Sequence, residues 1–135
     1  MLKIKYTQNW NGKLLSDFHT TIRAAKECYT VGTVVEELLN DVPLSKSRII
    51  QRRDFTLSEI TNTVALLDTG YNKAEAVAVL RKMNHEWLTQ HGENAPFCYL
   101  MLQVEERYIN TFETLIRTAA RRFDKLLPVI AQTSL

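Results

Sequence analysis

One short stretch of the chain carries residue types that can perform chemistry together. It reads Phe-His-Thr-Thr-Ile-Arg, and we interpret it as a β-strand. Because successive side chains of a strand point to opposite faces, His19, Thr21 and Arg23 share one face. Thr20 and Ile22 point the other way. The alternation therefore predicts a surface that presents a titratable base, a hydroxyl and a permanent cation.

A threonine hydroxyl becomes a useful nucleophile when a base lies within about 2.6 to 3.2 Å of its oxygen. His19 is the candidate base for Thr21. Side chains two residues apart on one strand point in parallel, with Cβ atoms about 6 to 7 Å apart, so the imidazole would have to bend toward the hydroxyl. Two interpretations stay open: a catalytic pair, or a polar strand face on which Arg23 pairs with a carboxylate.

Length and composition indicate one domain with a real core. The chain has 135 residues, of which 45% are apolar. It contains no apolar run long enough to span a membrane, and its first residues alternate Lys3 and Lys5 with apolar side chains, unlike a secretory signal. We therefore expect a cytoplasmic protein without a membrane partner.

The sequence predicts no metal site and no cofactor. Cys28 and Cys98 are far apart and form no Cys-x-x-Cys pair, so we read both as small apolar residues. His85 and His91 are six residues apart and lack a third ligand at suitable spacing.

The basic residues are concentrated in the first part of the chain. Residues 1–53 hold nine lysines and arginines against five acidic residues, whereas residues 54–135 hold eight against ten. Each half has one basic cluster, which is either a phosphate-contacting edge or a solvated face. The clusters are Lys46, Arg48, Arg52 and Arg53, and Arg117, Arg121, Arg122 and Lys125.

Periodicity predicts a first part that is mainly β-structure. Apolar and charged side chains alternate over residues 2–6, which indicates a strand, and Asn9 to Gly12 indicates a turn. Residues 13–18 are expected to form a helical turn that points Leu14, Leu15 and Phe18 inward. The β-branched run at 33–35 and the segment 45–55 are further predicted strands, with a reversal between them at 40–43.

Two short helices are expected next. Thr56 and Glu59 have capping-box spacing, and Leu57, Ile60, Val64 and Leu67 then recur with helical period as far as Gly70. Asn72 and Glu75 repeat the capping pattern before an apolar face of Ala76, Val79, Leu80 and Met83.

The remainder is predicted as a loop, a strand and a long helix. Apolar residues recur with no regular period over residues 85–96, which predicts a loop. Residues 97–102 are continuously apolar, which favours a strand buried on both faces. From Glu105 to Pro128, apolar residues recur every three or four positions, which predicts a terminal helix packed on the domain or on a partner subunit.

The order of these elements resembles the ASCH domains, α+β relatives of the PUA fold that have a small β-barrel crossed by helices. The resemblance covers residues 1–104 and leaves 105–135 as a helical extension. It also extends to uncharacterised phage and prophage proteins. Its motifs are Thr21-Ile22-Arg23, Tyr29-x-Val31-Gly32, the helix start at Phe55 to Glu59, the corner Asp68-Thr69-Gly70-Tyr71, and the closing strand at 97–102.

The resemblance implies a cleft that faces RNA or a modified nucleoside. Some members are amidohydrolases that remove the acyl group from acetylated cytidine by means of a threonine nucleophile, an activating lysine and an acid. Thr21 matches the threonine, Arg23 the arginine two residues later, and Asp68 falls close to the acid. The lysine is missing, because Phe18 occupies its place, and this leaves His19 as the candidate base.

Three functions are therefore considered. The first is binding of RNA or a nucleotide, with Arg23, Arg48 and Arg52 on phosphates and Tyr29 or Tyr71 available for stacking. The second is hydrolysis of an acylated cytidine by Thr21, Asp68 and His19. The third is assembly of an oligomer through the terminal helix.

Overall fold

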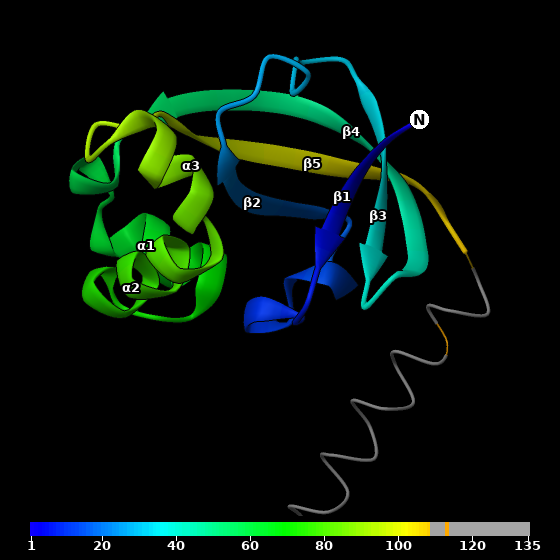
Figure 1. The fold of residues 1–135 in the computed structure, drawn as a ribbon. Coiled ribbons are helices and arrows are strands. Elements are labelled where there is room, and N and C mark those ends of the chain that lie inside the picture. Colours follow the sequence, from blue (N-terminus) through cyan, green and yellow to red (C-terminus); the bar gives the residue numbers. More distant parts are fainter. Residues whose placement is uncertain (109–112, 114–135) are drawn as a thin grey trace, which may run out of the picture.

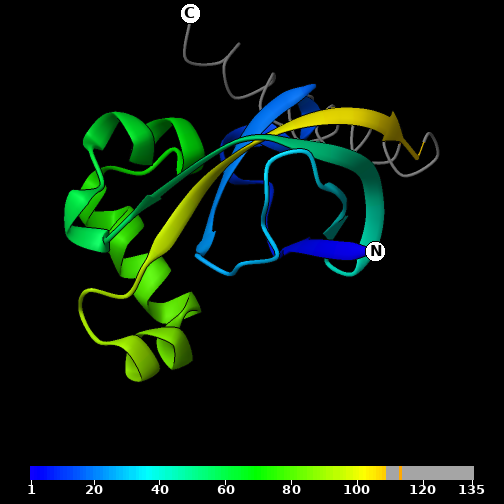
Figure 2. The ribbon, with the colours of Figure 1, turned by 90° about the horizontal axis from the view of Figure 1, so that it is seen from above.

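The computed structural model describes residues 1–108 and residue 113, and within them five strands form one curled sheet. The sheet order is β1-β3-β4-β5-β2, in which β1 and β3 are parallel and the other pairs antiparallel. Figures 1 and 2 show the long strands β4 and β5 running from the helices to the opposite end of the molecule. The strands are β1 (Leu2–Tyr6), β2 (Phe18–Ala24), β3 (Val34–Leu39), β4 (Val42–Phe55) and β5 (Phe97–Arg107).

The curled sheet forms a half-barrel, and the helices gather at one end of it (Figure 1). Ala65, Ala76 and Leu80 of the helices pack on Ile22 and Phe97 of the sheet, whereas a second apolar cluster fills the interior of the curl. This arrangement confirms an α+β fold with a small, partly closed barrel. The helical elements are η1 (Trp10–Leu15), η2 (Leu57–Glu59), α1 (Asn62–Thr69), α2 (Lys73–Met83) and α3 (His85–His91).

The helix predicted from Thr56 is divided in two. The capping box of Thr56 and Glu59 does form, but it opens the three-residue 3-10 helix η2, after which the backbone is extended at Ile60. α1 begins only after Thr61, whose side chain accepts a hydrogen bond from the Val64 amide. Because the break changes the phase of the helix, Leu67 lies outward and is 63% exposed.

Three other local predictions were wrong. Residues 85–91 form α3, a helix too short to show a period, instead of a loop. Phe18 belongs to β2 and is 56% exposed rather than inward. β5 continues to Arg107, so Glu105 lies in a strand and the sheet passes the predicted boundary at 104. The rest of the predicted terminal helix lies outside the described residues.

The corner between α1 and α2 matches the sequence prediction. Gly70 has φ of 78° and ends α1, with its amide donating to the Leu66 carbonyl at 2.9 Å. Because this left-handed conformation is unfavourable for residues with a Cβ, we expect Gly70→Ala to lower the free energy of unfolding by about 1 to 2 kcal/mol. Urea denaturation measures the change, and Thr63→Ala, at an exposed α1 position, should shift it by less than about 0.5 kcal/mol.

No helix in the described part of the chain is long and apolar enough to cross a membrane.

Candidate functional site

A small pocket of about 130 Å³ lies where the half-barrel meets the helices. We call it the helix–barrel pocket. β1 and β2 supply one side, η1 another, and the ends of α1 and α2 the rest, with α1 contacting both η1 and β2. Its polar and aromatic lining residues are Lys5, Tyr6, Trp10, Lys13, Thr21, Arg23, Asp68, Thr69 and Asn84.

Thr21 and Arg23 lie on the same face of β2, as the alternation predicts. Thr21 is only 3% exposed, and its Oγ1 accepts a hydrogen bond from Arg23 Nε at 3.0 Å. The guanidinium also donates to the Lys5 carbonyl at 2.6 Å and lies 4.9 Å from the centroid of the Tyr6 ring. Arg23 is therefore held in place by β1 and orients the threonine hydroxyl.

Asp68 reaches the same pocket from the last turn of α1. The residue is 3% exposed, and its Oδ1 accepts hydrogen bonds from Lys13 Nζ at 3.0 Å and from Thr20 Oγ1 at 2.8 Å. Thr20 and Thr21 thus point to opposite sides of β2 and serve different partners. The structure joins Thr21, Arg23 and Asp68 around one pocket.

Lys13 is a buried pocket residue that the sequence reasoning missed. It is 8% exposed, and burial lowers its pKa, while the neighbouring Asp68 carboxylate acts in the opposite direction. The resemblance places a lysine three residues before Thr21, where the exposed Phe18 stands. Asn11 and Gly12 have positive φ and bend η1 just before Lys13. The Asn-Gly pair is the local sequence signal of that bend, but it does not identify the lysine's partner.

His19 shares the face of Thr21 but has other partners. Its Nδ1 lies 3.1 Å from the Ser16 carbonyl oxygen, and its Nε2 lies 2.7 Å from Glu37 Oε2. Glu37 is fully buried, and its Oε2 also accepts from the Tyr6 hydroxyl at 2.6 Å. Both ring nitrogens are therefore engaged, and His19 is not placed as a base for Thr21 in this arrangement.

Protonation of the His19–Glu37 pair follows from these partners. The Ser16 carbonyl can only accept, so Nδ1 carries a proton. Burial acts to raise the pKa of Glu37, but the hydrogen bond and charge of His19, with smaller contributions that include Tyr6, outweigh it and lower the pKa. Glu37 is thus ionised at neutral pH. The half-barrel encloses this carboxylate beside the His19 ring.

The other predicted binding residues lie apart from the pocket. Arg48 pairs with Glu105 and donates to the Gly32 carbonyl at 2.7 Å, while Arg52 pairs with Asp54. Arg52 also donates to the Tyr29 and Lys26 carbonyls, at 2.7 and 2.8 Å, so both arginines hold the β2–β3 loop against β4.

The two predicted stacking tyrosines have structural neighbours. Tyr29 belongs to the interior core of the half-barrel. Tyr71 packs edge-on against Trp10 with ring centroids 5.5 Å apart, so Trp10 rather than Tyr71 lines the pocket. Sequence reasoning singles out no functional role for Trp10.

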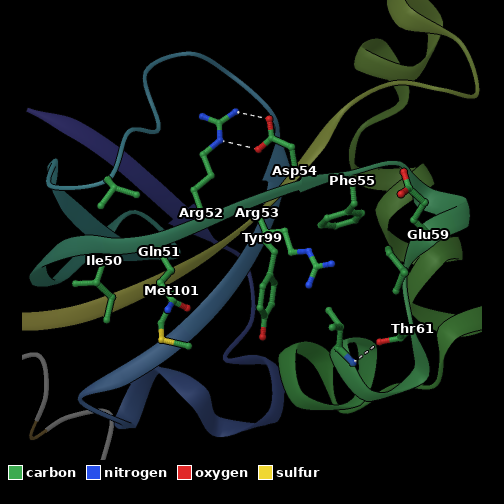
Figure 3. A pocket seen from close by; sticks show the side chains of 13 residues that line it. Ile50, Gln51, Arg52, Arg53, Asp54, Phe55, Glu59, Thr61, Tyr99 and Met101 are labelled. Carbon is green, nitrogen blue, oxygen red and sulfur yellow. Dashed lines mark hydrogen bonds and ion pairs between the residues drawn. The ribbon is translucent and has the colours of Figure 1, made fainter.

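A larger hollow of about 660 Å³ lies against the outer face of β4 and β5 (Figure 3). Arg53 and Tyr99 are paired across these strands and project into it together. Its charged residues are Arg52, Arg53, Asp54 and Glu59, two cations and two carboxylates. The hollow brings together no hydroxyl, base and acid, so it is a weaker candidate for chemistry than the helix–barrel pocket.

Over residues 1–108 and 113, no three potential metal ligands come together. The His91 ring packs on Trp87, with centroids 4.0 Å apart.

No protein-family model and no curated protein matches the chain. Its structure is similar to the crystal structure of protein EF3133 from Enterococcus faecalis, which is described by the family model DUF984. The TM-score is 0.56 and the sequence identity 13%, over 70% of this chain and 65% of that chain. The match thus spans slightly less than two thirds of the neighbour. At this identity the likeness shows the fold alone.

Proposed function

We propose that the chain is an ASCH-like module that binds RNA or a nucleotide in the helix–barrel pocket. The observation that carries the proposal is the convergence of Lys13, Thr21, Arg23 and Asp68 on one pocket between barrel and helices. Arg23 and Lys5 offer positive charge, Thr21 and Asp68 offer hydrogen-bonding groups, and Trp10 offers an aromatic wall. This combination suits a polar, planar group attached to phosphate.

The size of the pocket limits what enters it. Pockets for drug-sized ligands measure about 300 to 1,000 Å³, whereas this one measures about 130 Å³. The pocket therefore takes a base or a substituent on a base, while the sugar and phosphate stay at the rim. Lys5, an exposed residue of β1, is the cation at that rim.

Titration of cytidine monophosphate and of a short oligoribonucleotide by calorimetry tests the proposal. We expect binding that weakens as salt is raised, because phosphate contacts release counterions. Arg23→Gln should weaken binding about tenfold or more, because it removes a charged donor from the pocket. Arg48→Gln removes the same charge outside the pocket and should leave the affinity unchanged. Absence of binding, or binding indifferent to salt, contradicts the proposal.

Hydrolysis of an acylated cytidine is the second candidate, and Lys13 is the observation that favours it. A buried lysine with a lowered pKa lines the same pocket as the Thr21 hydroxyl and the Asp68 carboxylate. Lys13 donates to Asp68, and Thr21 accepts from Arg23. Hydrolysis requires Lys13 to leave Asp68 and approach the hydroxyl, so we place binding first.

An assay with N4-acetylcytidine separates the two candidates. An amidohydrolase would release acetate and cytidine, Thr21→Val would abolish turnover, and His19→Gln, which keeps a hydrogen-bonding side chain, would preserve the chemistry in whatever fraction stays folded. Product release that is equal with the native protein and with Thr21→Val removes the hydrolytic candidate and leaves the binding proposal intact.

A further inference from the structure

A second hollow adjoins the helix–barrel pocket. It measures about 580 Å³ and lies between the end of β2 and the junction of α2 and α3, so we call it the α2–α3 hollow. Met83 and Asn84 line both spaces, and β2 continues from Thr21 and Arg23 in the first to Ala24 in the second. A ligand too long for the pocket would therefore pass directly into this hollow.

The α2–α3 hollow has a fixed aromatic surface. Trp87 is half-buried, and its Nε1 donates to the Pro96 carbonyl at 2.9 Å, which sets the orientation of the indole. The ring also packs on His91. An indole held in this way loses little conformational entropy when a base stacks on it.

The charges that line the helix–barrel pocket and the α2–α3 hollow favour an extended anion. Together they are lined by five lysines and arginines, namely Lys5, Lys13, Arg23, Lys26 and Lys82, against the two carboxylates of Asp68 and Glu86. Lys13 and Asp68 neutralise each other, which leaves four cations against the carboxylate of Glu86. The hollow of Figure 3, in contrast, has equal numbers of cations and carboxylates.

Lys26 and Lys82 are suited to phosphate. Both are exposed, and neither has an ion-pair partner in the part of the chain that the structure describes. They approach the α2–α3 hollow from different elements, the loop after β2 and the last turn of α2.

We propose that the ligand is a single-stranded RNA segment rather than a free nucleoside. One base enters the helix–barrel pocket, the next stacks on Trp87, and the phosphates beyond it contact Lys26 and Lys82. This inference rests on the proposed binding function and extends it to the substrate class.

The test compares a cytidine oligoribonucleotide of about ten residues with cytidine monophosphate. The variant Lys26→Glu with Lys82→Glu should weaken oligonucleotide binding tenfold or more and reduce the salt slope by about 1.4, which corresponds to two lost phosphate contacts on a single strand. It should leave binding of cytidine monophosphate unchanged. Trp87→Phe should weaken oligonucleotide binding less, because a smaller ring remains.

Arg53→Glu is the control. It reverses one charge, compared with two in the double lysine variant, at an exposed residue of the Figure 3 hollow, and we expect it to leave both affinities unchanged. The inference is overturned if the oligonucleotide binds no better than the mononucleotide, if the double lysine variant binds it normally, or if Arg53→Glu weakens it equally. Failure of both probes to bind overturns the proposed function itself.

Discussion

Replacing His19 with alanine is expected to lower the free energy of unfolding at pH 7 by about 3 to 5 kcal/mol. His19 Nε2 lies 2.7 Å from Glu37 Oε2, and the two side chains are 2% and 1% exposed. Removing one partner leaves an uncompensated charge inside the half-barrel, and a loss of this size is typical of such a change. The Tyr6 hydroxyl remains on Glu37 and compensates only in part.

The double variant His19→Ala with Glu37→Gln separates charge from packing. If the buried charge causes the loss, the second substitution recovers part of the stability, because a neutral amide needs no counterion and still accepts from Tyr6. Guanidinium denaturation of the native protein, the two single variants and the double variant completes the cycle. Equal destabilisation by His19→Ala with and without Glu37→Gln contradicts the explanation based on the buried Glu37 charge.

The same pair predicts opposite responses to pH. In the native protein the pKa of Glu37 is lowered, so its contribution to stability is complete above its ordinary value of about 4.3 and is lost as the pH falls through the lower folded value. In His19→Ala, burial dominates and raises the folded pKa. The contribution of Glu37 is then present at low pH and is lost as the pH rises. Denaturation measured between about pH 3 and 7 should therefore show that the Glu37 contribution to stability grows with pH in the native protein and shrinks with pH in His19→Ala.

Lys13→Met is the second substitution with a large expected effect, and it acts on stability and binding together. It leaves Asp68, whose side chain is 4% exposed, with Thr20 but no cation. We expect a loss of about 3 to 5 kcal/mol of unfolding free energy, toward the lower end because the Thr20 hydrogen bond remains. Nucleotide affinity should fall about tenfold or more, because the buried cation of the pocket is gone.

A second substitution distinguishes these two effects. Lys13→Met with Asp68→Asn should regain stability, because no buried charge is left unpaired, but should not regain the affinity that depends on the lysine. Lys3→Met, at an exposed β1 position, controls for the loss of a surface cation and should change neither quantity. Full recovery of nucleotide binding in the double variant shows that Lys13 serves only the fold.

Local patterns in the sequence were sufficient for several parts of the site. Alternation along β2 placed Thr21 and Arg23 on one face, because that period is a property of any extended strand. Gly70 ended α1 for an equally local reason, its tolerance of positive φ. Both predictions required no knowledge of distant residues.

The helix predicted from Thr56 shows where local patterns fail. The capping box and the helical spacing up to Leu67 were both present, but Leu57 and Ile60 are buried across a break in the backbone. Packing on the sheet decided that break, because the free energy gained by burying two large apolar side chains exceeds the small preference for continuing a helix.

The sequence by itself determined most of the strand positions, the shared face of Thr21 and Arg23, and the corner that carries Asp68. Tertiary structure alone decided the charge partners: Lys13 meets Asp68 across 55 positions, and Glu37 meets His19 across 18. The physical reason is that a buried charge is stable only beside its counterion, and which counterion is near depends on how distant segments pack rather than on the residues next to it in the chain.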